Sequence, residues 1–143
     1  MKISISKVFI FSFVIFSLYV FWQGLNKNND YDTKSLTGSR ISNFHLIEIN
    51  NEDQYISEKE LEKNKFTLIN FFASWCAPCR AEHKYLLNLS RENKEIKIIG
   101  VNFKDKKINA NNFLKELSNP YDFVGKDTDG KTSILFGIYG IKV

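Results

Sequence analysis

The only cysteines among the 143 residues of this chain, Cys76 and Cys79, are separated by two residues. They directly follow Trp75 and enclose Ala77 and Pro78. Two thiols at this spacing can exchange with a substrate disulfide, because the second lies close enough to attack a mixed disulfide formed by the first. A helix that begins at Cys76 would also place a partial positive charge beside its sulfur and favour the thiolate. The motif therefore predicts a dithiol redox site.

Two elements must hold this pair, a strand before it and a helix after it. Residues 67–72 are apolar on both faces, which is typical of a central strand covered on both sides. After Cys79, apolar side chains recur on one face of a helix, opposite charged ones. A second buried strand is predicted at 96–101, broken at Gly100, and a further helix at 109–117. This order predicts a βαβ unit with a parallel sheet, and hence an α/β fold.

Three shorter segments flank this unit. The alternation of residues 44–49 predicts a strand, and Ser57 is expected to cap a short helix at 57–61. Residues 127–130, Asp-Thr-Asp-Gly, superficially resemble the start of a calcium loop. The rest of a twelve-residue loop and its closing Glu do not follow, so a turn is predicted there.

The N-terminal segment predicts a membrane anchor. No charged residue occurs between Lys7 and Lys27, and a helix of that length spans about 28 Å, close to the hydrocarbon thickness of a bilayer. Lys2 and Lys7 favour a cytoplasmic N-terminus, which places the rest of the chain across the membrane. A cleaved signal peptide is the alternative, but Trp22 puts a bulky ring where cleavage needs a small residue. Either way, the dithiol is expected to work in an oxidising compartment.

The sequence thus divides into three parts: a signal-anchor transmembrane helix at 1–26, a polar tether at 27–40 and a folded domain at 41–143. The net charge of +4 is partly due to Lys2 and Lys7, and the remaining basic residues are interspersed with acidic ones. Because no basic run is present, nucleic-acid binding is not expected.

Residues 66–83, which contain the dithiol, resemble the DsbE/CcmG family of membrane-anchored thioredoxin-like proteins of cytochrome c maturation. Residues 100–105 (Gly-Val-Asn-Phe-Lys-Asp) and 113–121 (Phe-Leu-Lys-Glu-Leu-Ser-Asn-Pro-Tyr) match the same family. Residues 137–140 (Gly-Ile-Tyr-Gly) are similar to its Gly-Val-Tyr-Gly segment. The resemblance runs from about residue 41 to 140 and implies a thioredoxin-like fold with a central mixed sheet.

The resemblance also implies a function. It predicts a reductant held in the inner membrane by a single pass, with its catalytic domain in the periplasm and no organic cofactor or metal. Electrons would come from a membrane thiol–disulfide transporter, and the substrates would be apocytochrome c or its haem-ligation partners. By this resemblance, Cys76 is the thiolate that attacks the substrate disulfide, and Cys79 is the thiol that resolves the mixed disulfide.

Four further residues are expected to shape the site by this resemblance. Trp75, Ala77 and Pro78 adjoin the cysteines, and Glu82 matches an acidic residue that tunes them. A carboxylate one helical turn past Cys79 opposes thiolate formation, which raises thiol pKa values and favours a more reducing couple. A solvated surface acid with no such role is the alternative for Glu82.

The C-terminal end departs from the family pattern. The family places a cis-proline opposite the dithiol, separated by one residue from the end of its Gly-Val-Tyr-Gly segment, and the matching residue here is Lys142. Pro78 and Pro120 are the only prolines, so no other residue can fill that role. A non-proline cis bond costs about 3 kcal/mol, so Lys142 is not expected to adopt one. The last two strands and the final helix of the fold are expected to be missing, which would expose a strand edge. A C-terminally truncated or frameshifted copy is therefore expected. The alternative is a short natural variant in which a partner covers the gap.

Other functions are open alternatives. A Cys-x-x-Cys pair can form half of a zinc site, but only His45 and His83 could complete it, and His83 is expected to be a partly buried helix residue. A non-catalytic copper-delivery module would need wider cysteine spacing and a distal histidine. Within the redox class, the alternative is a general membrane-anchored thiol reductase with no tie to cytochromes.

Overall fold

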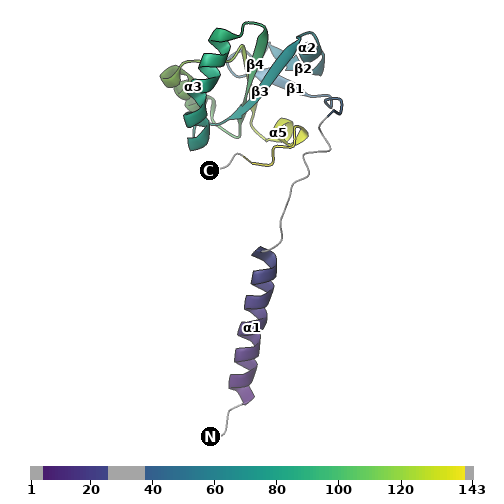
Figure 1. The fold of residues 1–143 in the computed structure, drawn as a ribbon, viewed down its shortest axis with the longest axis vertical. Helices are drawn as coiled ribbons and strands as arrows, with labels where there is room; N and C mark the ends of the chain where they lie inside the picture. The colour runs from purple at the N-terminus through teal and green to yellow at the C-terminus, as the bar shows by residue number, and fades with distance from the viewer. Residues whose placement is uncertain (1–4, 26–37, 141–143) are drawn as a thin grey trace. The chain divides into compact units, whose positions relative to one another are not determined.

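The computed structural model describes residues 5–25 and 38–140, which belong to two separate units of the chain (Figure 1). The first unit contains α1, Ile5–Leu25, a helix of 21 residues whose side chains are all exposed. By length and composition this helix could cross a membrane. The apolar N-terminal helix predicted from the sequence is therefore present. Most of the predicted tether at 27–40, and Lys142, lie outside the described residues.

The second unit is built on a five-stranded mixed sheet in the order β2-β1-β5-β4-β3. Its strands are β1 (His45–Glu48), β2 (Tyr55–Ser57), β3 (Phe66–Phe72), β4 (Ile96–Phe103) and β5 (Phe123–Asp127). β4 pairs in parallel with both β3 and β5, whereas β1 pairs antiparallel with β5 and β2. The predicted βαβ unit is thus confirmed in β3, α3 and β4.

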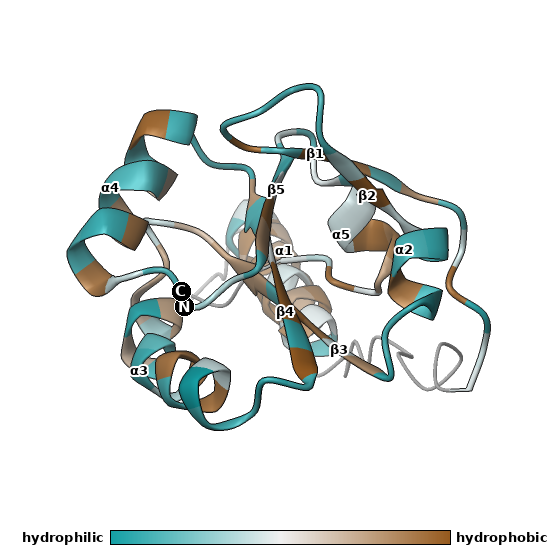
Figure 2. Ribbon diagram, turned by 90° about the horizontal axis from the view of Figure 1, so that it is seen from above, coloured by the Kyte–Doolittle hydropathy of each residue, from teal (hydrophilic) through white to brown (hydrophobic). Residues whose placement is uncertain are grey.

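Helices cover both faces of this sheet (Figure 2). They are α2 (Glu58–Glu62), α3 (Ala77–Glu92), α4 (Lys107–Leu117) and α5 (Lys131–Leu135). The α3 and α4 side holds one core cluster, which includes Phe72, Ile98, Phe113 and both cysteines. The α2 and α5 side holds a second cluster around Leu46, Ile99 and Val101. Because neighbouring residues of β4 point to opposite faces, Ile98 and Ile99 contribute to different clusters.

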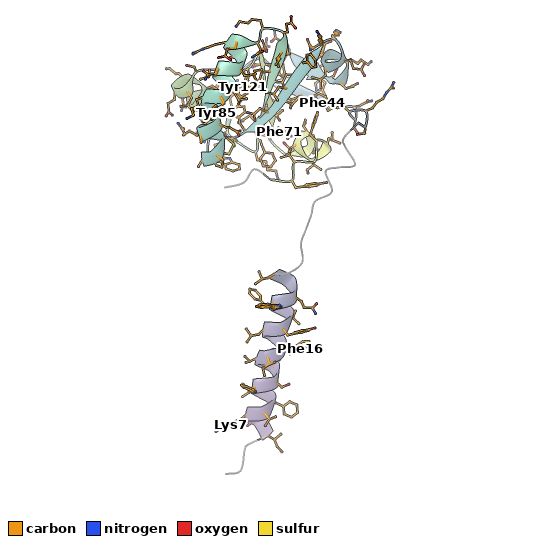
Figure 3. All side chains as sticks on the ribbon, viewed as in Figure 1. Lys7, Phe16, Phe44, Phe71, Tyr85 and Tyr121 are labelled. Carbon is orange, nitrogen blue, oxygen red and sulfur yellow. A yellow bond between two sulfur atoms is a disulfide. The ribbon has the colours of Figure 1, made fainter. Side chains whose placement is uncertain are left out.

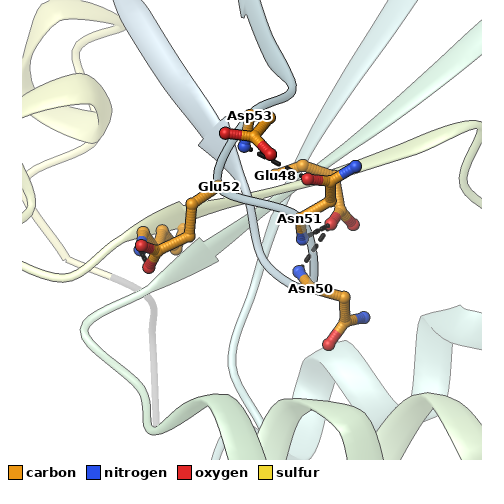
Figure 4. A network of polar contacts seen from close by, with 6 residues as sticks. Glu48, Asn50, Asn51, Glu52 and Asp53 are labelled. Atoms are coloured by element: carbon orange, nitrogen blue, oxygen red, sulfur yellow. Dashed lines mark hydrogen bonds and ion pairs between the residues drawn. The ribbon is translucent and has the colours of Figure 1, made fainter.

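The turn between β1 and β2 is fixed by its own polar groups (Figure 4). The Glu48 carboxylate accepts hydrogen bonds from the backbone N–H groups of Asn50 and Asn51, at 2.5 and 2.6 Å. The Asn50 and Asn111 side-chain amides also exchange hydrogen bonds at 3.3 and 2.8 Å, which ties this turn to α4. These contacts hold the antiparallel part of the sheet beside the parallel part.

Two sequence predictions about the strands were wrong. Residues 67–72 were expected in a central strand, but among the described residues β3 pairs only with β4 and ends the sheet order. Gly100 was expected to break the second strand, but it lies inside β4 and pairs with Asn70 and Val124. A Cβ at Gly100 would meet the Tyr121 ring at 2.8 Å, so this glycine makes room for a side chain rather than ending a strand.

Two further details also differ from the sequence predictions. Ser57 stands at the N-cap of α2, but its side chain makes no capping hydrogen bond there. His83 was expected to be partly buried, yet it is only 2% exposed. The turn predicted at residues 127–130 is confirmed, because it joins β5 to α5.

Candidate active site at the start of α3

The two cysteines lie where β3 gives way to α3. Residues 73–76 join the strand to the helix, and the Cys76 N–H donates to the Ala73 carbonyl at 3.1 Å. Cys76 is the N-cap residue of α3, as the sequence predicted, and Pro78 lies in the first turn. Proline is well suited to this position, because its missing N–H has no partner within a helix anyway.

The Cys76 sulfur caps the helix. Its Sγ accepts a hydrogen bond from the Cys79 N–H at 3.2 Å. A backbone N–H and the positive end of the helix dipole therefore both point at this sulfur, and each stabilises a negative charge there. This is the local environment that makes a cysteine thiol acidic and reactive.

The structure shows the oxidised pair. Cys76 and Cys79 form a disulfide, with their Cα atoms 5.3 Å apart. Both residues are nearly inaccessible in this form, at 1% and 5% exposure. Trp75, in contrast, is 45% exposed, and Ala77 and Pro78 are also at the surface. The disulfide is thus covered, while the residues around it form the accessible surface.

Glu82 lies one turn beyond Cys79 but faces a different feature. It lines a groove of about 430 Å³ between α3 and β3. Asn70, Tyr85 and four apolar residues of the two elements line the same groove. Neither cysteine lines this groove. Burial raises the pKa of the Tyr121 hydroxyl (the residue is labelled in Figure 3) well above the ordinary value, the hydrogen bond with Asn70 lowers it, and the Glu82 carboxylate raises it.

A third residue holds the loop before the dithiol. The Asp105 carboxylate accepts hydrogen bonds from both the N–H and the hydroxyl of Ser74, two residues before Cys76. Asp105 follows β4, whose carboxyl end lies beside that of β3 in the parallel sheet. The sequence contained this residue in a matched segment, but no role was assigned to it. The signal that could have identified Asp105 is its position after a predicted parallel strand, because the carboxyl ends of neighbouring parallel strands lie at the same edge of the sheet.

The two histidines are not brought together. His83 is buried in α3, where its Nε2 lies 2.7 Å from the Ser118 carbonyl oxygen. His45 is exposed on β1 and stacks on Tyr55, with ring centroids 4.3 Å apart. Within residues 5–25 and 38–140, no group of three or more His, Cys, Asp or Glu residues could hold a metal ion.

The acidic segment at the end of β5 has a structural role. The buried Asp127 carboxylate accepts hydrogen bonds from the N–H groups of Thr132 and Ser133, at 3.2 and 2.8 Å, and from the Ser133 hydroxyl at 2.6 Å. Its oxygens are therefore occupied in holding α5 against the end of β5.

Comparison with known proteins agrees with this geometry. The model of the Redoxin family matches residues 36–142. This chain belongs to the Redoxin family. It is 36% identical to a thiol:disulfide interchange protein DsbE of Tatumella citrea over 133 residues, which cover 90% of this chain and 70% of that relative. It is 49% identical to a thiol:disulfide interchange protein CycY of Rhizobium leguminosarum bv. viciae over 79 residues, which cover 55% and 42% of the two chains.

A solved structure supports the same fold. A thioredoxin-like protein from Aeropyrum pernix superposes with a TM-score of 0.59 at 20% identity, over 70% of this chain and 71% of that one. The fold of this Redoxin-family chain is thus thioredoxin-like, and its DsbE and CycY relatives place it in the DsbE/CcmG group. With a Cys-x-x-Cys disulfide at the start of α3, the chain is a thiol–disulfide oxidoreductase.

Proposed function

We propose that this chain is a membrane-anchored periplasmic reductant that reduces the disulfide of apocytochrome c or of its haem-ligation partners. The observation that carries this proposal is the position of Cys76 Sγ at the N-cap of α3, where the Cys79 N–H donates to it. That position makes Cys76 the more acidic thiol and hence the attacking one.

The reaction begins from the dithiol form. The Cys76 thiolate attacks one sulfur of the substrate disulfide, so that a Cys76–substrate disulfide forms and the second substrate sulfur leaves as a thiolate, which takes up a proton. Cys79 then loses its proton and attacks the Cys76 sulfur. The substrate departs with two thiols and two more electrons, and the chain is left with the Cys76–Cys79 disulfide seen in the structure. A dithiol donor in the membrane returns the pair to the reduced form.

The surrounding residues have distinct proposed roles. The exposed side chain of Trp75 and the exposed Ala77 and Pro78 provide the surface on which a substrate disulfide approaches. Pro78 also fixes the backbone of the first helical turn. Glu82, on the same helix, contributes negative charge that opposes thiolate formation and makes the couple more reducing.

The cytochrome pathway is supported by the motifs in which this chain resembles the DsbE/CcmG family, at residues 66–83, 100–105 and 113–121. The proposed location is supported by α1 and by the basic residues before it, because an excess of Lys on one flank favours the cytoplasmic side.

The test uses the full chain in detergent, reduced beforehand, with two disulfide peptides as substrates. One peptide carries an oxidised Cys-x-x-Cys-His sequence, and the other carries the same cysteines without the His. The proposed function predicts faster reduction of the first peptide, whereas equal rates would indicate a general thiol reductase. Cys79→Ser should accumulate a mixed disulfide through Cys76, and Cys76→Ser should form none. Reduction that survives Cys76→Ser would exclude the mechanism.

A further inference from the structure

Asp105 lies in the short segment between β4 and α4 and contacts the loop that carries the dithiol. The Ser74 N–H donates to Oδ2 of Asp105 at 2.7 Å, and the Ser74 hydroxyl donates to Oδ1 at 3.1 Å. One carboxylate therefore holds both the backbone and the side chain of a residue two positions before Cys76. Hydrogen bonds to an ionised acceptor are stronger than those between neutral groups.

The carboxylate is itself fixed from its own side of the sheet. Asn102, a residue of β4 that is 2% exposed, donates from Nδ2 to Oδ2 of Asp105 at 3.3 Å. The Lys106 N–H donates to Oδ1 at 2.8 Å, at the position that caps α4. Asp105 thus connects three parts of the unit: the end of β4, the start of α4 and the loop after β3.

The loop that Asp105 holds is short, and its Ala73 and Cys76 are buried in the core. Only residues 73–76 separate β3 from α3, and the hydrogen bond from the Cys76 N–H to Ala73 closes them into a turn. Ser74 lies inside this turn, so a shift of Ser74 moves the backbone of Cys76 relative to the first N–H groups of α3. The distance between the Cys76 sulfur and the Cys79 N–H decides how strongly a thiolate is stabilised.

We propose that Asp105 is a positioning residue of the dithiol reaction, which holds Ser74 so that the Cys76 sulfur stays at the N-terminus of α3 in both redox states. This role rests on the proposed function, in which Cys76 is the attacking thiolate. Asp105 acts through Ser74 and does not itself exchange protons or electrons with the substrate.

The direction in which the Cys76 pKa changes distinguishes a positioning role of Asp105 from an effect of its charge. Loss of a negative charge near a thiol, taken alone, lowers its pKa, because the thiolate is then repelled less. Loss of the positioning contact raises the pKa, because the sulfur leaves the helix N-terminus. The Asp105→Asn side chain keeps one oxygen and replaces the other with an NH₂ group, which cannot accept from Ser74. Positioning therefore predicts a higher thiol pKa and slower reaction, whereas charge alone predicts the opposite.

The experiment measures the rate at which iodoacetamide alkylates Cys76 as a function of pH. It uses the full chain in detergent with Cys79→Ser as the background, so that one thiol is present. Asp105→Asn should raise the pKa of Cys76 and slow alkylation at pH 7 by about 3- to 10-fold, because a smaller fraction of the thiol is then ionised and the thiolate is the form that reacts. Ser74→Ala removes the hydroxyl and keeps the N–H contact, so it should shift the profile in the same direction by less.

Glu92→Gln is the matched control, because it changes a carboxylate to an amide at the far end of α3, about 22 Å from the helix start. Its alkylation profile should equal that of the parent. An unchanged or lowered Cys76 pKa in Asp105→Asn overturns the inference. If Asp105→Asn does not fold, an unchanged or lowered Cys76 pKa in Ser74→Ala overturns it instead. The measurement needs no substrate, so a failure here leaves the proposed reductase activity to its own test.

Discussion

The side-chain amide of Asn70 donates a hydrogen bond to the hydroxyl oxygen of Tyr121 at 3.2 Å, across the sheet face that α3 covers. Asn70 comes from β3, the strand that leads to the dithiol, and Tyr121 from the segment between α4 and β5. The Tyr121 ring also stacks on Phe72, with centroids 5.1 Å apart. The strand before the active site is therefore tied through one tyrosine to the segment that leads into β5.

Tyr121→Phe is expected to reduce the free energy of unfolding by about 1 kcal/mol at neutral pH, because the hydrogen bond is lost while the ring contacts remain. Urea unfolding followed by Trp75 fluorescence measures this difference. Tyr85→Phe is the matched control, since Tyr85 is 65% exposed. Equal losses in the two variants would contradict a role for the Asn70 contact.

Tyr121 also predicts how stability changes at high pH. Burial raises the pKa of the folded hydroxyl above the value near 10 that it has in the unfolded chain. The folded state then holds a proton that the unfolded state releases, so this contribution is complete below about pH 10 and is lost as the pH rises further. The unfolding free energy should fall more steeply above pH 10 in the parent than in Tyr121→Phe. Parallel curves for the two proteins would contradict the assignment.

Glu82→Gln is expected to lower the pKa of the Cys76 thiol and to make the couple less reducing, because a negative charge on the same helix is removed. Alkylation of Cys76 against pH measures the first effect, and equilibration with a glutathione buffer measures the second. Glu92→Gln, at the opposite end of α3, should change neither quantity. An unchanged Cys76 pKa would mean that Glu82 is a surface acid with no effect on the thiol.

Gly100→Ala is expected to destabilise the domain by about 1–3 kcal/mol, because the added methyl group would meet three ring carbons of Tyr121 at 2.8–3.0 Å. The melting temperature measures this loss. Gly140→Ala is the control, since nothing lies within 4 Å of a Cβ built at that position. A Gly100→Ala protein as stable as the Gly140→Ala protein would mean that the ring moves aside without cost.

The anchor role of α1 predicts retention in the membrane fraction after alkaline extraction. Phe13→Lys together with Phe16→Lys should release the chain, because each charge in mid-helix costs about 2.5–3.5 kcal/mol of insertion free energy. The same two positions changed to Leu serve as the control and should remain bound. The mass of the membrane-bound chain reports whether the segment is cleaved, and a shortened chain would exclude an uncleaved anchor.

The sequence predicted the parts of this fold that have strong local patterns. The strand into the dithiol, the helix capped by Cys76 and the following strand all carry continuous apolar or helical periodicity. β5 was missed because Gly125 and Lys126 interrupt its apolar pattern. The need for a glycine at position 125 comes from a residue distant in sequence, because a Cβ there would clash with the Leu46 side chain on β1. The sheet order was likewise beyond local patterns, so β3 was placed at the centre.

The residues of the candidate site likewise differ in whether local sequence patterns predict them. The cysteines, Trp75 and Pro78 are contiguous, and their chemistry follows from residue type and spacing alone. Whether Glu82 faces the thiols or the groove beside β3 depends on how α3 is rotated against the sheet, and sequence spacing leaves this undetermined. The contact between Asp105 and Ser74 joins residues 31 positions apart, through the alignment of two parallel strands. Such contacts need the register of the sheet, which the sequence pattern does not supply.

The burial of the oxidised pair has a consequence for how the protein exchanges electrons with its surroundings. With Cys76 and Cys79 only 1% and 5% exposed, a thiol in solution reaches either sulfur less readily than it would reach an exposed disulfide. Exchange with a small-molecule redox buffer is therefore expected to be slow, although it still reaches equilibrium. A protein partner that contacts the exposed Trp75, Ala77 and Pro78 is expected to exchange electrons with the pair faster than a small thiol does.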